Sequence, residues 1–230
     1  MMSFDNYTLV RSRRKTLALY IRNGGVEARA PLRMPKSEID KFVASKAKWI
    51  SDKLAQSLEQ KDRRESFSLN YGDVITYRGA DFPITAKDCK KPGFDGERFY
   101  MPPNLTPEQI KAACIRVYRA LAKEHLTDRT FAFAAQMAVN PTCIKINGAQ
   151  TRWGSCSSKG SINYSWRLIT AEDSVIDYVV VHELAHLLQM NHSARFWSIV
   201  QSVLPDFEKR RASLRKLQHR FNAEDWSAVK

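Results

Sequence analysis

The sequence is poor in histidine and cysteine, with five and four of them among its 230 residues. The cysteines are widely separated and form no C-x-x-C pair, which excludes a zinc ribbon or a dithiol redox motif. No apolar run is long enough to cross a bilayer, and the N-terminal segment lacks the apolar stretch and cleavage site of a secretory signal. We therefore expect a cytoplasmic protein with reduced cysteines and no membrane segment.

Acidic residues are also few compared with basic ones. There are 24 Asp and Glu against 37 Lys and Arg, which gives a net charge of +13, and the basic residues cluster at 11–15, 87–91 and 209–220. A basic protein attracts polyanions, so nucleic acid and nucleotide phosphates are candidate partners. No motif that reads bases accompanies the charge, however, and solvated basic surfaces that keep the protein in solution are the alternative explanation.

The hydrophobic pattern divides the chain into two parts. Residues 7–32 alternate as in short strands, and the spacing of apolar residues from Pro35 onward predicts one long helix. The polar run 59–66 is expected to end that helix as a linker, and a second β-rich stretch follows over 67–100. We therefore predict an N-terminal β-rich region with one long helix over residues 1–104.

The second part, residues 105–230, is predicted to form a helix, short strands and two further helices. Thr106 can cap a helix that begins with Pro107, and the side chain of Gln109 can reach back to the cap. Helical spacing then continues towards Met137. Separate helices and short strands in this order predict an α+β fold.

Three of the five histidines lie close together, in the segment VVVHELAHLLQMNHSARFW. His182 and His186 are four residues apart in a run with helical spacing, so both imidazoles lie on one face and can share a metal ion. Glu183 lies beside His182 around the helix, within reach of a water on that ion. This H-E-x-x-H pattern predicts a metal site with a general base next to it.

His192 lies six residues beyond His186, too far along an unbroken helix to reach the same ion. Asn191 tolerates the left-handed conformation that ends helices, so we expect the helix to run to Met190 and the chain to turn back there. The turn would bring His192 in as a third ligand. Three histidines with an open fourth position favour a catalytic zinc, whose activated water Glu183 would deprotonate.

The segment 143–169, directly before this helix, alternates as two strands with turns at 153–155 and 157–160, and it predicts a hairpin. The edge of the hairpin could hold an extended peptide by main-chain hydrogen bonds. Arg152 is a candidate for stabilising developing negative charge or binding a substrate carboxylate or phosphate; alternatively, it forms an ion pair within the hairpin. Cys156 is a candidate nucleophile or fourth metal ligand, but a thiolate would close the site, so we favour a structural role.

Two segments, TRWGSCSSKGSINYSWRLI and VIDYVVVHELAHLLQMNHSARFW, closely resemble the YgjP-like metallopeptidases, and RSRRKTLALYIRNGGVEARAP resembles the opening of that family. The family looks related to the SprT-like and WLM groups, which act on proteins bound to DNA. The resemblance implies zinc ligands at His182, His186 and His192, with Glu183 as the catalytic acid and base. It also implies a zincin-like core that combines the motif helix, a backing helix and a small antiparallel sheet.

We therefore predict a zinc-dependent hydrolase, in the first place a metallopeptidase acting on peptides or proteins, with Glu183 and Arg152 as catalytic residues. The first alternative is a metal-dependent hydrolase of nucleoside triphosphates attracted by the basic clusters, although the sequence has no P-loop. The second alternative is a nucleic-acid-associated protein in which a structural metal takes Cys156 as its fourth ligand.

Overall fold

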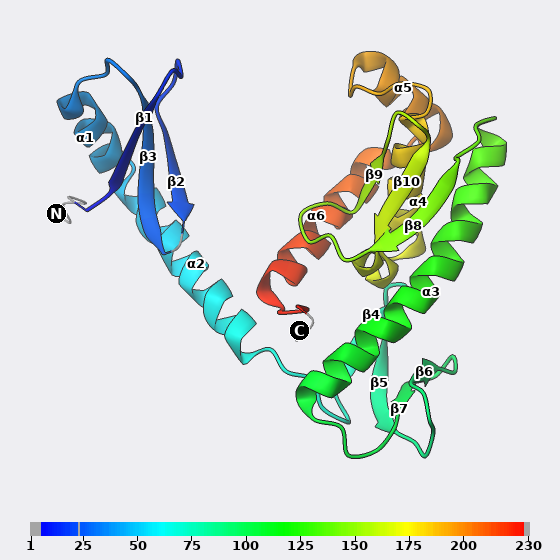
Figure 1. Cartoon of the computed structure of the whole chain (residues 1–230). Coiled ribbons are helices and arrows are strands. Elements are labelled where there is room, and N and C mark those ends of the chain that lie inside the picture. Colours follow the sequence, from blue (N-terminus) through cyan, green and yellow to red (C-terminus); the bar gives the residue numbers. More distant parts are fainter. Residues whose placement is uncertain (1–5, 23, 228–230) are drawn as a thin grey trace. The chain divides into compact units, whose positions relative to one another are not determined.

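The structure, a computed structural model, describes residues 6–22 and 24–227. The chain divides into two compact units, Met1–Phe67 with Asn222–Glu224 and Ser68–Phe221 with Asp225–Lys230. Both units combine helices with small sheets (Figure 1), so the predicted α+β class is confirmed. No helix in the described ranges is both long and apolar enough to span a membrane.

The first unit is a three-stranded sheet with two helices. The strands β1 (Thr8–Ser12), β2 (Ala18–Arg22) and β3 (Gly25–Pro31) lie in the order β1-β3-β2, and β3 is parallel to β1 and antiparallel to β2. The helices are α1 (Lys36–Ser45) and α2 (Ala47–Ser66). Alternate residues of β3 and one face of the helices form the buried core, which contains Val26, Ala28, Ala30, Ile39, Val43 and Ile50.

The single long helix predicted for this region is two helices in the structure. They are separated at Lys46, whose backbone angles (φ −105°, ψ 12°) lie outside the helical region. The polar run 59–66, expected to be a linker, instead completes α2. Ion pairs one turn apart stabilise the helix there, between Glu59 and Arg63 and between Lys61 and Glu65.

Residues 68–104 belong to the second unit, whereas the sequence pattern placed them with the first. They form β4 (Val74–Tyr77), β5 (Ala80–Ala86), β6 (Gly93–Phe94) and β7 (Phe99–Met101), in the order β4-β5-β7-β6. The sheet packs on the following helix, since the rings of Phe99 and Tyr118 are 5.3 Å apart and Tyr118 donates a hydrogen bond to the Thr76 carbonyl at 2.7 Å. Alternation along a strand does not specify which helix the strand packs on, which explains the difference.

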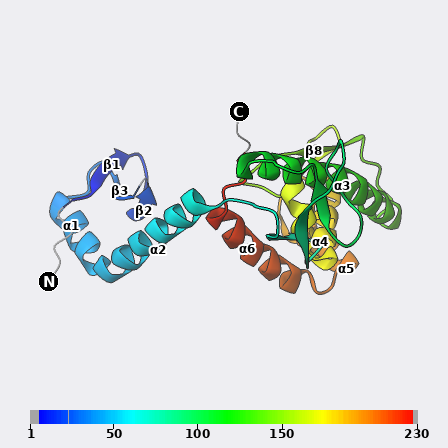
Figure 2. The same cartoon turned by 90° about the horizontal axis from the view of Figure 1, so that it is seen from below.

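The long helix α3 (Pro107–Gln136) begins as predicted. The Thr106 hydroxyl accepts a hydrogen bond from the Gln109 N–H, and the Gln109 side chain accepts one from the Thr106 N–H at 2.9 Å. The helix packs on the 3-10 helix η1 (Trp166–Thr170) and on α4 (Asp173–Ala185). Figures 1 and 2 show α4 between α3 and the last helix, α6 (Phe207–Ala223). The helix with the H-E-x-x-H motif is therefore an internal element of the second unit.

A second small sheet lies against these helices. Its strands β8 (Cys143–Asn147), β9 (Gly154–Cys156) and β10 (Ser161–Ser165) lie in the order β8-β10-β9. The expected motif helix, backing helix and small sheet are therefore all present, but the sheet is mixed, because β10 is parallel to β8 and antiparallel to β9. The predicted hairpin of β8 and β10 is wrong, because these two strands are parallel. The segment β9, interpreted from the sequence as a turn, is a strand that pairs with the other side of β10.

Candidate metal centre

The helix α4 ends earlier than predicted. Its last helical residue is Ala185 rather than Met190, and the next turn is closed by a hydrogen bond from the Gln189 N–H to the Ala185 carbonyl at 2.9 Å. Asn191 does not adopt the left-handed conformation. The described non-glycine residues with positive φ are Arg78, Asn104 and Ala138. The side chain of Asn191 accepts a hydrogen bond from the Gln189 side chain at 2.7 Å.

The segment after α4 nevertheless brings together His182, His186 and His192. Their potential ligand atoms lie within 4.8 Å of one another, and the Nε2 atoms of His182 and His192 are 3.1 Å apart. Two nitrogens on one tetrahedral zinc ion would be about 3.3 Å apart. Phe196, from α5 (Ala194–Val203), is fully buried and packs on the three rings at centroid distances of 4.9, 4.6 and 4.7 Å. The spacing of the donors therefore suits a single ion.

Burial keeps the imidazoles of His182 and His186 neutral, which is the form that binds metals. Burial, with the charges of His186, His192 and Arg211, lowers the pKa of His182 to about 3, and burial also lowers the pKa of His186. His186 Nδ1 lies 3.3 Å from the Gln189 carbonyl, which leaves its Nε2 for a metal. The buried Nδ1 of His182 has no hydrogen-bond partner among the described residues.

Glu183 lies beside the histidines and is 5% exposed. Burial raises the pKa of its carboxyl to about 8, against the opposing effect of Arg152. The backbone of β9 crosses closely over it, because a Cβ added at Gly154 would lie 2.5 Å from Glu183 Oε1. A glycine is therefore needed for this approach. Sequence reasoning missed this contact, since a glycine in a presumed turn gives no sign of the side chain that it covers.

A cleft of about 200 Å³ opens beside His182 and Glu183. Trp153 borders it next to β9, Tyr178 borders it from α4, and Leu214 borders it from α6. A histidine and a buried carboxyl at the wall of one cleft can act on the same bound molecule. The geometry therefore suits a metal-assisted reaction with a base at hand.

Comparison with known protein families agrees with this geometry. Residues 15–217 match the family model described as YgjP-like, metallopeptidase domain. The chain belongs to the YgjP-like metallopeptidase family. The resemblance carried by the motif helix and the RWGSCS segment is thereby confirmed, and a metallopeptidase requires a catalytic metal. The three histidines are a group in the described part of the chain that could hold one.

Two solved structures share a partial likeness with the chain. The metallopeptidase zymogen of Pyrococcus abyssi abylysin has 22% sequence identity and a TM-score of 0.37, over 41% of this chain and 93% of that one. The metallopeptidase zymogen of Methanocaldococcus jannaschii jannalysin has 17% identity and a TM-score of 0.36, over 41% and 95%. No curated protein matches the chain.

Arg152 and Cys156 lie on either side of Gly154 and differ in what they can do. Arg152 is exposed and forms no ion pair with another described residue, so the structure provides no partner for it within the sheet. Burial, with the charge of Glu183, raises the pKa of the Cys156 thiol to about 11. A thiol that stays protonated is a poor nucleophile, and Cys156 is not in the group of described residues whose ligand atoms lie within 4.8 Å of one another. Cys156 is therefore left with a packing role.

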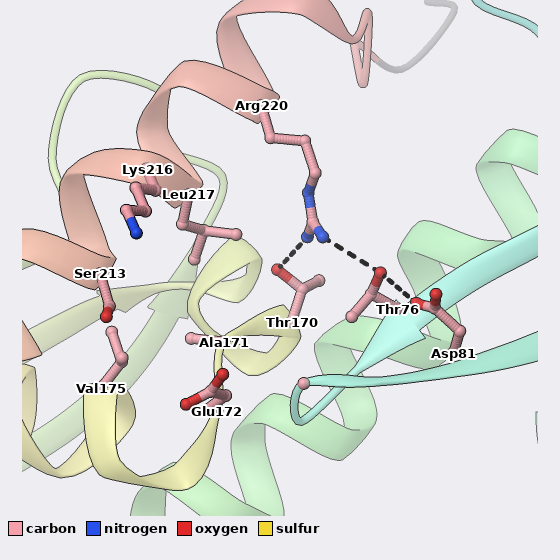
Figure 3. Close-up of a pocket in the computed structure, with 11 residues that line it drawn as sticks. Thr76, Asp81, Thr170, Ala171, Glu172, Val175, Ser213, Lys216, Leu217 and Arg220 are labelled. Atoms are coloured by element: carbon pink, nitrogen blue, oxygen red, sulfur yellow. Dashed lines mark hydrogen bonds between the residues drawn. The ribbon is translucent and has the colours of Figure 1, made fainter.

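A larger pocket, of about 500 Å³, lies at the other end of α4. Figure 3 shows the guanidinium of Arg220 beside it, donating hydrogen bonds to the hydroxyls of Thr76 and Thr170, each at 3.1 Å. The charged residues that line it have both signs and are Asp81, Glu172, Lys216 and Arg220. These groups link α6 to β4 and η1, and they include none of the histidines. The histidine group therefore lies at the opposite end of α4 from this pocket.

Proposed function

We propose that this metallopeptidase binds one zinc ion through His182, His186 and His192 and uses Glu183 as its general base and acid. The observation that carries the proposal is the convergence of three imidazoles beside one buried carboxyl. Three nitrogen donors with room for a fourth ligand are typical of catalytic zinc.

When bound, zinc lowers the pKa of a coordinated water towards neutrality and polarises a carbonyl group. Glu183 ionises beside the cation, since a nearby opposite charge lowers a carboxyl pKa. Its carboxylate oxygen then takes the proton of the attacking water and returns it to the departing amine nitrogen. The backbone at Gly154 limits the movement of Oε1, so the carboxyl stays aimed at the reacting atoms.

Two further features bind the peptide in this proposal. β9 is an edge strand, so an extended substrate can pair with its free side through main-chain hydrogen bonds. Arg152 lies two residues before β9 begins, and its positive charge acts to lower the pKa of the Glu183 carboxyl. We assign to Arg152 the stabilisation of negative charge that develops on the carbonyl oxygen.

Replacement of the base tests this function. In the zinc-loaded Glu183→Gln variant, peptide hydrolysis should fall by about 10²- to 10⁴-fold, because the amide cannot accept the proton. Metal content, measured by mass spectrometry, should stay at one ion per chain. Glu172→Gln is the matched control, since Glu172 is exposed and precedes the first turn of the same helix. Unchanged hydrolysis in Glu183→Gln with metal still bound would contradict the assignment.

The two alternative functions have less support. Phosphoanhydride cleavage would use the same metal and water, and a panel of nucleoside triphosphates tested with zinc, magnesium and manganese decides that question. A structural metal would need a fourth protein ligand, and Cys156 is not in the group of described residues that His182, His186 and His192 form. The peptidase function is therefore the one we carry forward.

A further inference from the structure

Two arginines of α6 lie at the rim of the catalytic cleft. The guanidinium carbon of Arg211 is 5.1 Å from the ring centroid of Trp197, and Trp197 stacks on His192 at a centroid distance of 5.8 Å. Arg215 follows one helical turn later on the same face, and its neighbour Leu214 lines the cleft. The basic face of α6 therefore borders the metal centre.

The positive charge of these arginines reaches the cleft itself. Tyr178, which lines the cleft, stacks on Phe207 at a centroid distance of 6.4 Å. Phe207 in turn stacks on Trp197, the ring over which the Arg211 guanidinium lies. A substrate group bound beside these side chains would experience the same positive potential.

Neither arginine is neutralised by the protein. Arg211 and Arg215 are exposed and form no hydrogen bond or ion pair with any residue of the described ranges. Their neighbour Arg210 behaves differently, because it binds the Asp206 carboxylate at 2.9 Å and the Ser174 carbonyl at 3.0 Å. The arginine that faces α4 is thus paired, while the two at the cleft keep their donors for another molecule.

A groove of about 530 Å³ lies beside Trp197 and offers room for a substrate side chain. Its charged lining residues are Asp206, Glu208, Lys209 and Arg211. The carboxylate of Asp206 is already bound by Arg210, so Glu208 alone opposes the basic residues there. With Arg215 one turn along the helix, positive charge predominates on this side of the metal centre.

We propose that Arg211 and Arg215 select peptide substrates that carry a carboxylate close to the scissile bond. The selection rests on the peptidase function proposed above and deepens it. A guanidinium presents paired N–H donors that match the two oxygens of an aspartate or glutamate side chain. A substrate lysine or arginine at the same position would instead be repelled.

The zinc-loaded full chain can be tested on peptides of one common sequence that carry Glu, Gln or Lys at successive positions around the cleaved bond. At one or more of these positions, kcat/KM should follow the order Glu, Gln, Lys, with about a tenfold difference between Glu and Lys. The difference should shrink as salt is added, since the arginines are exposed. Mass spectrometry of the products identifies the cleaved bond.

Charge variants then assign the preference to these residues. In Arg211→Glu/Arg215→Glu, the ratio of kcat/KM for the Glu and Lys peptides should fall below one. The gentler variant Arg211→Gln/Arg215→Gln should bring this ratio close to one, and it serves if the first variant does not fold. The control is Arg116→Glu/Lys123→Glu, which changes the net charge equally at exposed positions of α3 and should keep the wild-type ratio.

The outcomes separate this selection from the function on which it rests. If wild-type protein hydrolyses peptides without regard to their charge, or if the α6 variants keep the preference, the selection is overturned and the peptidase function stands. If zinc-loaded protein cleaves no peptide but does hydrolyse a nucleoside triphosphate, the peptidase function itself fails. A preference for Glu that disappears only in the α6 variants supports the proposal.

Discussion

The two ends of α4 hold their charged groups in opposite ways. At the N-terminal end, Asp173 accepts hydrogen bonds from Nε (2.7 Å) and Nη2 of Arg78, and Asp177 accepts one from Nε of Arg129 (2.7 Å). These bonds tie the helix to the turn between β4 and β5 and to α3. Charges paired in this way contribute to stability and leave little capacity for chemistry.

At the C-terminal end, His182, Glu183 and His186 are largely buried, and no oppositely charged side chain is bonded to them in the described part of the chain. Burial therefore favours their neutral forms, with the pKa of His182 lowered to about 3 and that of Glu183 raised to about 8. Such groups cost folding free energy, and they are typical of functional sites. One end of the helix holds it in place, and the other end carries the side chains to which we assign metal binding and catalysis.

The largest expected effect comes from removing one of the histidines. His186→Ala should lower metal affinity and reduce peptide hydrolysis by more than about 100-fold. Removing a residue that only hydrogen-bonds to a metal ligand already costs up to about 100-fold, and the loss of a ligand itself should cost more. The metal content after dialysis and kcat/KM measure both effects. His219→Ala, at an exposed position on α6, should change neither. If His186→Ala kept its full metal content and activity, the assignment of the metal site to this end of α4 would be wrong.

The next effect concerns the strand that covers the base. Gly154→Ala should reduce kcat/KM by about 100-fold with the metal retained, because the new methyl group displaces the Glu183 carboxyl. Gly25→Ala in β3 is the matched control, since the nearest atom to its added Cβ is 3.6 Å away. It should leave activity unchanged. Wild-type activity in Gly154→Ala would show that the position of the carboxyl does not depend on β9.

His186 and Gly154 also show what the sequence can and cannot predict. The spacing of His182, Glu183 and His186 is local, so helical periodicity alone indicates that the three side chains lie near one another. The capping of α3 by Thr106 is local in the same sense, and it was predicted correctly. The class of fold followed from the same patterns.

The parts that could not be predicted depend on contacts between distant segments. Nothing near Gly154 in the sequence indicates that Glu183 lies beneath it, and nothing near Arg211 indicates that it borders the histidines. The parallel pairing of β8 with β10 likewise depends on β9, which lies between them in the chain but pairs with the other side of β10. The end of α4 was misjudged because the stop was inferred from the tolerance of Asn191 for a left-handed conformation that it does not adopt, and the helix already ends at Ala185.

A smaller effect is expected at the paired end of α4. Asp177→Asn should lower the free energy of unfolding by about 1–2 kcal/mol, because it weakens a charge-assisted hydrogen bond to Arg129 at a side chain that is 14% exposed. Urea unfolding measures this loss. Metal content and kcat/KM should stay at the wild-type values, since Asp177 lies away from the cleft. A loss of activity without a loss of stability would break the distinction between the two ends.

The smallest effect should appear as a pH dependence at Asp173. The hydrogen bond from Arg78 lowers the pKa of this carboxyl below its ordinary value of 3.8. Its contribution to stability is therefore fully present above the ordinary pKa and is lost as pH falls through the lowered value. Because the pair is partly exposed, Asp173→Asn should cost only about 0.5 kcal/mol at neutral pH. Both proteins are measured without metal, so that acid release of the ion does not contribute. The difference in unfolding free energy between wild type and variant should then shrink towards zero in strong acid. A difference that stays constant with pH would mean that the ionised carboxylate is not what holds this end of α4.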